Sequence, residues 1–197
     1  MKKTLSYILA IVVCLATLCG CGVTPSGGQT TDGPRDSVML RNALGMQTTD
    51  PADTNETDVL TVNEQIYEGL YTLDESGGGY QPCLAKEIDI SDDATVYTIT
   101  LQDGVKFHNG ETLKASDVVF SYQHFMDNPK YNSYTDMIEK VEALDDSHVV
   151  ITIARPYSPI LHTFFKIKIL SEKEVTSQGS DFGTIANLAG TGPYYMD

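Results

Sequence analysis

The stretch from Leu84 to Ser121 constrains the fold most, because signals for strands, turns and a helix follow one another in it without a gap. Apolar and polar residues alternate from Tyr97 to Leu101, which is typical of a strand with one buried face. Polar turn residues precede that segment, and a short alternating segment at residues 88–90 precedes the turn. We therefore predict a β-hairpin at the start of this stretch.

Two glycine turns and a change of period follow the hairpin. Asp103-Gly104 and Asn109-Gly110 bracket Val105–Phe107, which predicts a short third strand between the turns. After Lys114 the apolar residues recur at helical spacing, so a helix with one apolar face should follow. The residues of this face are Val118, Val119, Tyr122, Phe125 and Met126.

Further motifs lie before and after this stretch. They are Asp50-Pro51, Ile66-Tyr67-Glu68-Gly69-Leu70, Pro82 with Leu84-Ala85, Asp117-Val118-Val119-Phe120-Ser121 and Gly190-Thr191-Gly192-Pro193-Tyr194. Together with DGVKFHNG at residues 103–110, their order resembles the extracellular solute-binding proteins of family 5, the peptide, oligopeptide and nickel receptors of ABC importers. The resemblance implies an α/β fold of the type II periplasmic-binding-protein-like class, present here in part: lobe I with an inserted, mixed β-rich subdomain.

Two positions depart from the pattern of that family. Gln102 stands where the family usually has a basic residue, and Lys114 stands where it usually has Thr just before the helix. A Thr would cap the helix, and Asp117 would complete a capping box. Because the Lys114 side chain cannot accept that hydrogen bond, we expect the helix start to be weaker by about 1 kcal/mol.

Residues 1–20 have the pattern of a lipoprotein signal peptide. Lys2 and Lys3 precede an apolar run from Leu5 to Leu18, and Leu18-Cys19-Gly20-Cys21 resembles a bacterial lipobox. We predict that Cys21 carries the lipid that anchors the protein in the membrane. The alternative is an ordinary signal peptide with a chance cysteine.

The rest of the chain divides by composition and by resemblance. Residues 21–36 are rich in Gly, Ser, Thr and Pro, which predicts a flexible tether. The resemblance assigns 37–197 to the N-terminal portion of the solute-binding domain, with 37–50 and 186–197 in the lobe I core and 51–185 in the inserted subdomain. Because the family's Gly-Thr-Gly-Pro-Tyr motif marks the return to lobe I, we expect the chain to be an N-terminal fragment.

The remaining elements are predicted from apolar spacing and turn residues. They are a strand at 37–44, a helix at 59–70 capped by Thr57 or Asp58, a polar loop at 127–134, strands at 137–144 and 148–153, a helix starting at Ser158-Pro159 with Ser158 as its cap, a strand-like segment at 167–170 and a short helix at 171–175.

Composition and motifs exclude several classes of function. The formal net charge of −14 argues against nucleic acid as a partner, because phosphate binding needs clustered Lys and Arg. The chain has no Gly-x-Ser-x-Gly or His-Glu-x-x-His motif and no Cys/His pairing, so we expect no catalytic residues. Its four histidines lack the spacing of ligands, so no metal site or cofactor is expected. Cys83, the one cysteine left outside the signal and lipid positions, is interpreted as a packing residue.

In the family, two lobes close over the ligand. The resemblance implies that the loop after Asp50-Pro51 and the tyrosine-rich loop before residue 137 contribute to the site. The candidate ligand-binding residues are Asn55, Glu56, Thr57, Tyr131 and Tyr134. Alternatively, Thr57 only caps a helix and the two tyrosines cover the core of the subdomain. Phe164 and Phe165 are expected in the core.

The leading hypothesis is a monomeric, lipid-anchored receptor that delivers oligopeptides or dipeptides to the permease subunits of an ABC importer. Its place would be the extracytoplasmic face of the membrane: the cell surface in a Gram-positive organism, the periplasm otherwise. A receptor for nickel chelates or another small solute is the alternative in the same class. A structural surface lipoprotein, or a remnant without function, is the alternative in a different class.

Overall fold

The computed structural model describes residues 48–184 and 190–195 of the 197-residue chain. Contacts divide the chain into Met1–Met39 and Leu40–Asp197, and all described residues belong to the second unit. The predicted signal peptide, Cys21, the tether and the strand at 37–44 lie outside the described residues, as does half of the 186–197 segment, residues 186–189 and 196–197. None of the described helices has the length and apolarity needed to span a membrane.

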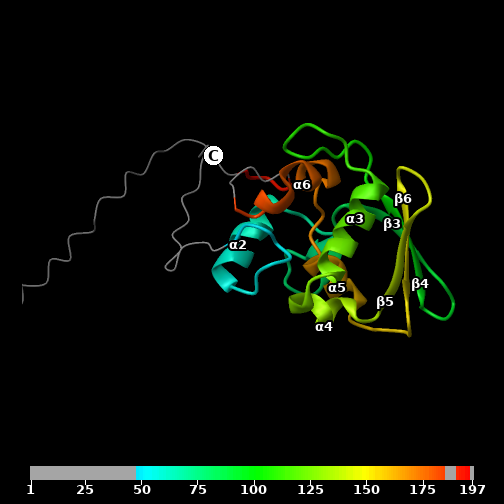
Figure 1. Cartoon of the computed structure of the whole chain (residues 1–197). Coiled ribbons are helices and arrows are strands. Elements are labelled where there is room, and N and C mark those ends of the chain that lie inside the picture. The colour runs from blue at the N-terminus through cyan, green and yellow to red at the C-terminus, as the bar shows by residue number, and fades with distance from the viewer. Residues whose placement is uncertain (1–47, 185–189, 196–197) are drawn as a thin grey trace, which may run out of the picture. The chain divides into compact units, whose positions relative to one another are not determined.

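A four-stranded antiparallel sheet lies at one side of the described chain, with the helices against one of its faces (Figure 1). Its strands are ordered β3-β4-β6-β5, so two hairpins join through their second strands: β3 (Ala85–Ile90) with β4 (Val96–Leu101), and β5 (Ile138–Ala143) with β6 (His148–Ile153). Both hairpins confirm the sequence prediction. Alternate residues of β4 and β6 are buried, and they form one continuous apolar face: Tyr97, Ile99, Leu101, Val149, Ile151 and Ile153.

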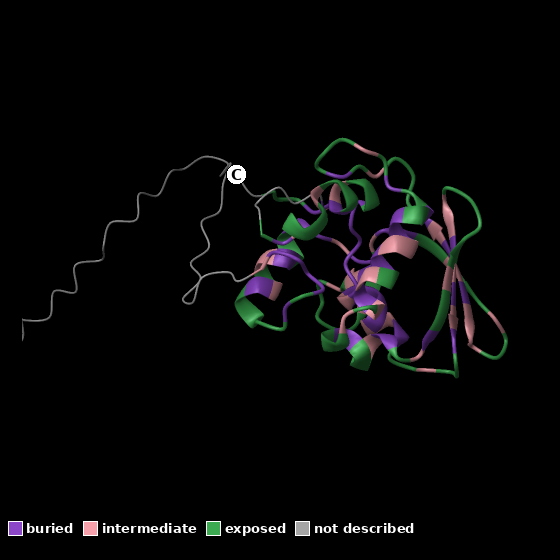
Figure 2. Cartoon of the chain, in the orientation of Figure 1, coloured by how far each residue is buried: buried purple, intermediate pink, exposed green. Residues whose placement is uncertain are grey.

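Two helices cover this apolar face. The helix α3 (Ala115–Met126) packs on β5 and β6, and its predicted stripe is right except that Val119 and Met126 are only half-buried. The helix α5 (Ile160–Lys166) brings Phe164 against Tyr97, with ring centroids 5.7 Å apart. Figure 2 shows buried residues on the sides of these helices and strands that face one another. Phe164 lies in the main apolar cluster as predicted, whereas Phe165 is buried outside that cluster, under the ammonium groups of Lys166 and Lys168.

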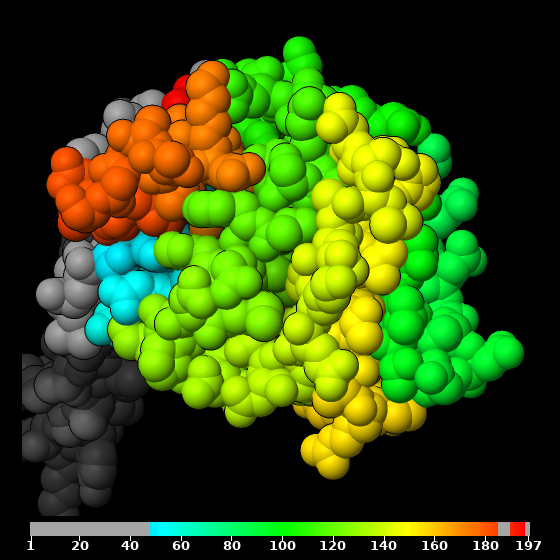
Figure 3. Space-filling view, turned by 45° about the vertical axis from the view of Figure 1, so that its right-hand side comes forward, coloured from blue at the N-terminus to red at the C-terminus, as the bar shows by residue number. Residues whose placement is uncertain are grey.

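The start of the described chain forms a second, smaller group of elements. The helix α2 (Thr57–Ile66) is followed by a hairpin of β1 (Tyr71–Leu73) and β2 (Tyr80–Pro82). The helix α6 (Glu172–Gln178) packs beside α2 through a small apolar cluster that includes Ile66 and Val175. Figure 3 shows the segment around α6 (orange) lying against the start of the described chain (cyan) and α3 (green). The Thr49 N–H donates to the Gly183 carbonyl at 2.8 Å, which joins the two segments directly.

The predicted helix at 59–70 is too long. Helix α2 ends at Ile66, and the chain then runs extended so that Gly69 forms an antiparallel bridge with Lys168. A Cβ atom at Gly69 would lie 2.6 Å from the Phe164 carbonyl oxygen, so this close approach requires glycine. The predicted strand at 167–170 is reduced to the same single bridge.

Other predictions need smaller corrections. The predicted strand at 105–107 is one isolated bridge between Lys106 and Thr112. Helix α5 begins at Ile160 with Pro159 at its N-cap, so Ser158 does not cap it. The predicted polar loop at 127–134 contains a 3-10 turn and a short helix, η1 (Pro129–Tyr131) and α4 (Asn132–Thr135). The last short helix is α6 as expected, capped by Ser171, and a 3-10 turn, η2 (Gly179–Asp181), follows it.

The start of α3 has half of a capping box. The Asp117 carboxylate accepts a hydrogen bond from the Lys114 N–H at 2.9 Å, but the Lys114 side chain gives no cap and instead pairs with Asp146 at 3.1 Å. The other Asp117 oxygen accepts from the Glu172 N–H at 3.0 Å. Burial raises the pKa of Asp117. This aspartate therefore fixes the start of α3 to the start of α6.

Candidate functional site

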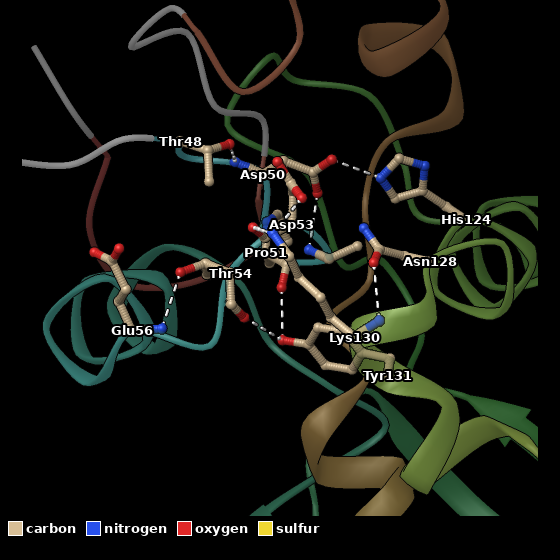
Figure 4. Close-up of polar contacts among 11 residues, drawn as sticks. Thr48, Asp50, Pro51, Asp53, Thr54, Glu56, His124, Asn128, Lys130 and Tyr131 are labelled. Atoms are coloured by element: carbon tan, nitrogen blue, oxygen red, sulfur yellow. Dashed lines mark hydrogen bonds and ion pairs between the residues drawn. The ribbon is translucent and has the colours of Figure 1, made fainter.

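The loop that contains the first group of candidate residues, called here the Asp50 loop (residues 48–56), is folded by its own polar side chains. The Asp50 carboxylate accepts from the Ala52 N–H at 2.8 Å, and the Asp50 N–H donates to the Thr48 hydroxyl at 3.1 Å. At the other end, the Glu56 N–H donates to the Thr54 hydroxyl at 3.1 Å (Figure 4). These short-range bonds fold the chain tightly around Pro51, as aspartate and threonine side chains do in turns.

Three side chains from the end of α3 and from η1 brace this loop from one side. The Tyr131 hydroxyl donates to the Pro51 carbonyl at 2.7 Å and also lies 3.3 Å from the Thr54 carbonyl. The Lys130 ammonium donates to the carboxylate and the carbonyl of Asp53, both at 2.6 Å. His124 Nε2 lies 2.9 Å from the Asp50 carboxylate. Figure 4 shows the three braces converging on the loop.

The charges of these braces are set by their partners. The hydrogen bond to Asp50 raises the pKa of His124, which favours the imidazolium form and hence an ion pair. The hydrogen bond from Lys130 lowers the pKa of Asp53. Burial raises the pKa of Tyr131, so its hydroxyl keeps the proton that it donates. The loop is therefore held by two charged contacts and one neutral contact.

The first group of candidate residues lies at the junction of the Asp50 loop and α2. Asn55, Glu56 and Thr57 are all exposed, and the Glu56 side chain points away from Tyr131 in Figure 4. Glu56 is the N-cap of α2 and makes no capping hydrogen bond with its side chain. The prediction that Thr57 or Asp58 caps this helix is therefore wrong, and the side chains of residues 55–57 project from a braced backbone.

The two candidate tyrosines differ in position. Tyr131 is 3% exposed and its hydroxyl is used in the brace, so the structure gives it the packing role considered as the alternative. Tyr134 is half-buried, with its ring centroid 5.9 Å from that of Tyr131 and 5.5 Å from that of His162. The structure thus brings Tyr131 to the loop that carries Asn55–Thr57 and places Tyr134 one ring further away. Ligand contact by these five residues stays a prediction.

Sequence reasoning missed the charged braces. The spacing of His124 in the sequence indicates no site, and no motif marks Lys130 or Asp53. The Asp50-Pro51 motif marked the loop, but His124 is 74 residues further along the chain, and no local pattern indicates that the two meet.

The opposite end of α2 meets the Gly-Thr-Gly-Pro-Tyr motif. The Gly192 and Tyr194 N–H groups donate to the carbonyls of Ile66 and Gln65 at 2.9 and 3.1 Å, which satisfies the last turn of the helix. A Cβ atom at Gly190 would lie 2.0 Å from the Ile66 oxygen. His108 joins this contact, with Nε2 2.7 Å from the Gly192 carbonyl.

Groups that would hold a metal ion were sought within residues 48–184 and 190–195. In these ranges, no three His, Cys, Asp or Glu side chains are placed together for that purpose.

Comparison with known proteins identifies the family. The family model "Bacterial extracellular solute-binding proteins, family 5 Middle" matches residues 79–197. The chain belongs to this family. Its members are solute-binding proteins rather than enzymes. Among curated relatives, the glutathione-binding protein GsiB of Salmonella typhimurium is 33% identical over 167 residues and that of Escherichia coli K12 is 31% identical over 166 residues. The matches cover 81% of this chain but 32% of each relative, so the chain spans about a third of their length.

Solved structures support the predicted fold class. OppA of Listeria monocytogenes bound to peptide has a TM-score of 0.70 and 29% identity, covering 75% of this chain and 33% of that one. NikZ of Campylobacter jejuni with Ni(L-His) has a TM-score of 0.65 and 34% identity, and the match covers 77% of this chain and 31% of NikZ. DppA of Helicobacter pylori with the peptide STSA has a TM-score of 0.67 and 26% identity, and the match covers 75% of this chain and 34% of DppA. The chain is therefore mixed α/β and forms part of a type II periplasmic-binding-protein-like fold, as predicted.

Proposed function

We propose that the protein is the substrate-binding component of an ABC importer and that it binds oligopeptides or dipeptides between two lobes. The observation that carries the proposal is the braced Asp50 loop, which presents three exposed polar residues in a chain of the solute-binding family. Its relatives suggest the ligand class, since OppA and DppA were solved with peptides and GsiB binds glutathione.

The side chains of residues 55–57 suit the polar groups of a peptide. The Asn55 amide both donates and accepts hydrogen bonds, the Thr57 hydroxyl does the same, and the Glu56 carboxylate accepts from an ammonium group. Because the braces fix the backbone beneath them, little conformational entropy is lost when a ligand binds. The opposite wall of the site belongs, in this proposal, to the part of the family's length that the chain does not span.

The proposal includes an extracytoplasmic location with a lipid anchor. Cleavage after residue 20 and acylation of Cys21 would attach residues 37–197 to the membrane through the 21–36 tether, next to the permease subunits. Within 37–197, segments 37–50 and 186–197 would belong to lobe I and 51–185 to the inserted subdomain. The lipobox-like sequence supports the anchor. Growth with a radioactive fatty acid should label the wild-type protein and leave Cys21→Ser unlabelled, and equal labelling would contradict it.

Nickel chelates are the second candidate ligand, because the solved relative NikZ, with Ni(L-His), is 34% identical to this chain. A calorimetric titration of residues 22–197, or of the longer product if the gene continues, separates the two. The ligands are a mixed peptide library, glutathione and a nickel–histidine chelate. In a thermal melt of the same protein, a peptide at 100 times its Kd should raise the free energy of unfolding by about 2.7 kcal/mol.

Variants of the site make this titration specific. Asn55→Ala and Glu56→Gln should weaken peptide binding without changing the melting temperature of the free protein, because both residues are exposed. Asp92→Asn, an exposed change in the β3–β4 turn, is the matched control. A cooperative melt that none of these ligands shifts would contradict the proposal and favour a surface lipoprotein without transport function.

A further inference from the structure

A second polar site lies at the other end of α2. A hollow of about 280 Å³, called here the Lys168 pocket, is lined by the end of α2, by β1 and by side chains near the end of α5. Helix α2 has ten residues, so at about 1.5 Å per residue the pocket is roughly 15 Å from the Asp50 loop. The two sites are therefore separate, and the pocket is not part of the proposed peptide site.

The pocket contains the buried ammonium group of Lys168, which has no direct ion-pair partner among the described residues. Lys168 is 7% exposed, and its ammonium lies over the Phe165 ring, 4.4 Å from the centroid. Within residues 48–184 and 190–195 it makes no ion pair within 4.0 Å, whereas the exposed Lys130 and Lys173 are both paired. A buried charge without a partner is costly, and burial lowers the pKa of Lys168 to about 8. A ligand carboxylate would supply the direct ion pair that Lys168 lacks among the described residues.

Two carboxylates line the same pocket. Glu64 and Glu68 act on Lys168 from a distance and favour its charged form, but neither contacts the ammonium. Glu68 accepts a hydrogen bond from the Cys83 thiol at 3.4 Å. Burial raises the pKa of Cys83 to about 12, so the sulfur is a protonated donor and not a nucleophile.

The charges around the Lys168 pocket limit which ligands it can bind. The lining has charges of both signs, the Lys168 ammonium and two carboxylates, and Lys166 acts on Lys168 from outside the lining. A simple anion would leave the carboxylates unpaired, and a simple cation would leave Lys168 unpaired. A zwitterion can pair with Lys168 through its anionic group and with Glu64 and Glu68 through its cationic group. The volume of 280 Å³ equals roughly nine waters at about 30 Å³ each, which suits a molecule with about the number of non-hydrogen atoms of leucine. Phe165 and Tyr71 supply apolar surface for a side chain.

We propose that the Lys168 pocket binds a free apolar α-amino acid, with its carboxylate on Lys168, its ammonium on Glu64 and Glu68, and its side chain against Phe165. A peptide terminus does not meet these requirements, because each end of a peptide has only one of the two charges. The proposal does not depend on peptide binding by the Asp50 loop, and either can fail without the other.

Titration with three related ligands tests this charge pattern. L-leucine should bind to the protein of residues 22–197, while N-acetyl-L-leucine and L-leucinamide, which lack the ammonium or the carboxylate charge, should bind at least about tenfold more weakly. Equal binding of all three would overturn the proposal. So would the absence of a heat signal or thermal shift with about 10 mM leucine, which saturates a site with a Kd of about 1 mM.

Two variants and one spectroscopic signal assign the binding to the pocket. Lys168→Met should abolish leucine binding, whereas Lys166→Met should keep it, because Lys166 also lies over Phe165, at 5.3 Å, but does not line the pocket. If Lys168→Met does not fold, Glu68→Gln should weaken binding at least about threefold. In the wild type, NMR titration of the Lys168 ammonium should give a higher pKa when leucine is bound. An unchanged pKa, or full binding by Lys168→Met or Glu68→Gln, would overturn the assignment.

Discussion

The two ends of α2 differ in how their polar groups are satisfied. At the start, the Asp50 loop has an internal partner for each charged brace: Asp50 with His124 and Asp53 with Lys130. Beyond the end, Lys168 is buried over an aromatic ring, and within the described part of the chain no carboxylate reaches it. Internal pairing at one end makes a rigid platform, while the unpaired charge at the other makes a site that a ligand can complete. Opposite responses to mutation should reveal this difference.

The largest effect should come from Asp50→Ala. It removes the partner of a half-buried imidazolium and the acceptor for the Ala52 N–H, so the free energy of unfolding should fall by about 2–3 kcal/mol. Urea denaturation measures this loss. Asp92→Ala, which removes an exposed carboxylate elsewhere, should stay within about 0.5 kcal/mol of the wild type. Similar losses for the two variants would mean that the loop is not braced by its charges.

Tyr131→Phe should have the next largest effect. The ring keeps its edge-to-face contact with Phe125, with centroids 4.6 Å apart, and only the hydroxyl that holds Pro51 and Thr54 is lost. We expect a loss of about 1–2 kcal/mol in urea denaturation, together with weaker peptide binding. Tyr134→Phe is the matched control and should change stability by less than about 0.5 kcal/mol. The packing role of Tyr131 fails if the two variants are equally stable.

Lys168→Met should act in the opposite direction. Replacing an unpaired buried ammonium by an apolar chain of similar length should leave stability unchanged or raise it by about 1 kcal/mol at pH 7. The wild type should become more stable between about pH 8 and 10.5, because the unfolded chain then binds more protons than the folded chain, and the variant should lack this rise. If Lys168→Met were clearly less stable than the wild type, Lys168 would have a stabilising anionic partner, which contradicts the contrast drawn here.

The smallest effect should be the pH dependence of the His124 brace. Because the pKa of His124 is raised in the folded protein, its contribution is fully present below about pH 6.5 and is lost as the pH rises through the folded value. The groups that act on it are Asp50, Asp127 and Asp53. The difference in unfolding free energy between the wild type and His124→Gln should therefore shrink, by less than about 1 kcal/mol, from pH 6 to pH 9. A constant difference would show that folding does not shift the pKa of His124.

Periodicity predicted the parts of the fold that depend on neighbouring residues. The hairpins and α3 were found because alternation at Tyr97–Leu101 and helical spacing after Lys114 directly reflect which side chains are buried. The end of α2 was placed too late, because the extended chain after Ile66 is imposed by the bridge from Gly69 to Lys168, almost a hundred residues away in sequence.

The candidate site shows the same limit. A motif and a helix start mark the loop of Asn55–Thr57 in the sequence, and the structure shows these residues exposed, so ligand contact by them stays a prediction. Tyr131 was chosen because it lies in a tyrosine-rich segment, and sequence gives no means of telling a tyrosine that faces a ligand from one that holds a carbonyl. The unpaired Lys168 could not be found either, because burial without a partner is a property of the assembled fold.

The packing of Gly190 and Gly192 on the last turn of α2 has a mechanical consequence. With its beginning tied through the Asp50 loop and its final carbonyls occupied by the returning chain, the helix is gripped at both extremities. The returning chain at Tyr194 and the loop that carries Asn55 are therefore joined through a single hydrogen-bonded helix.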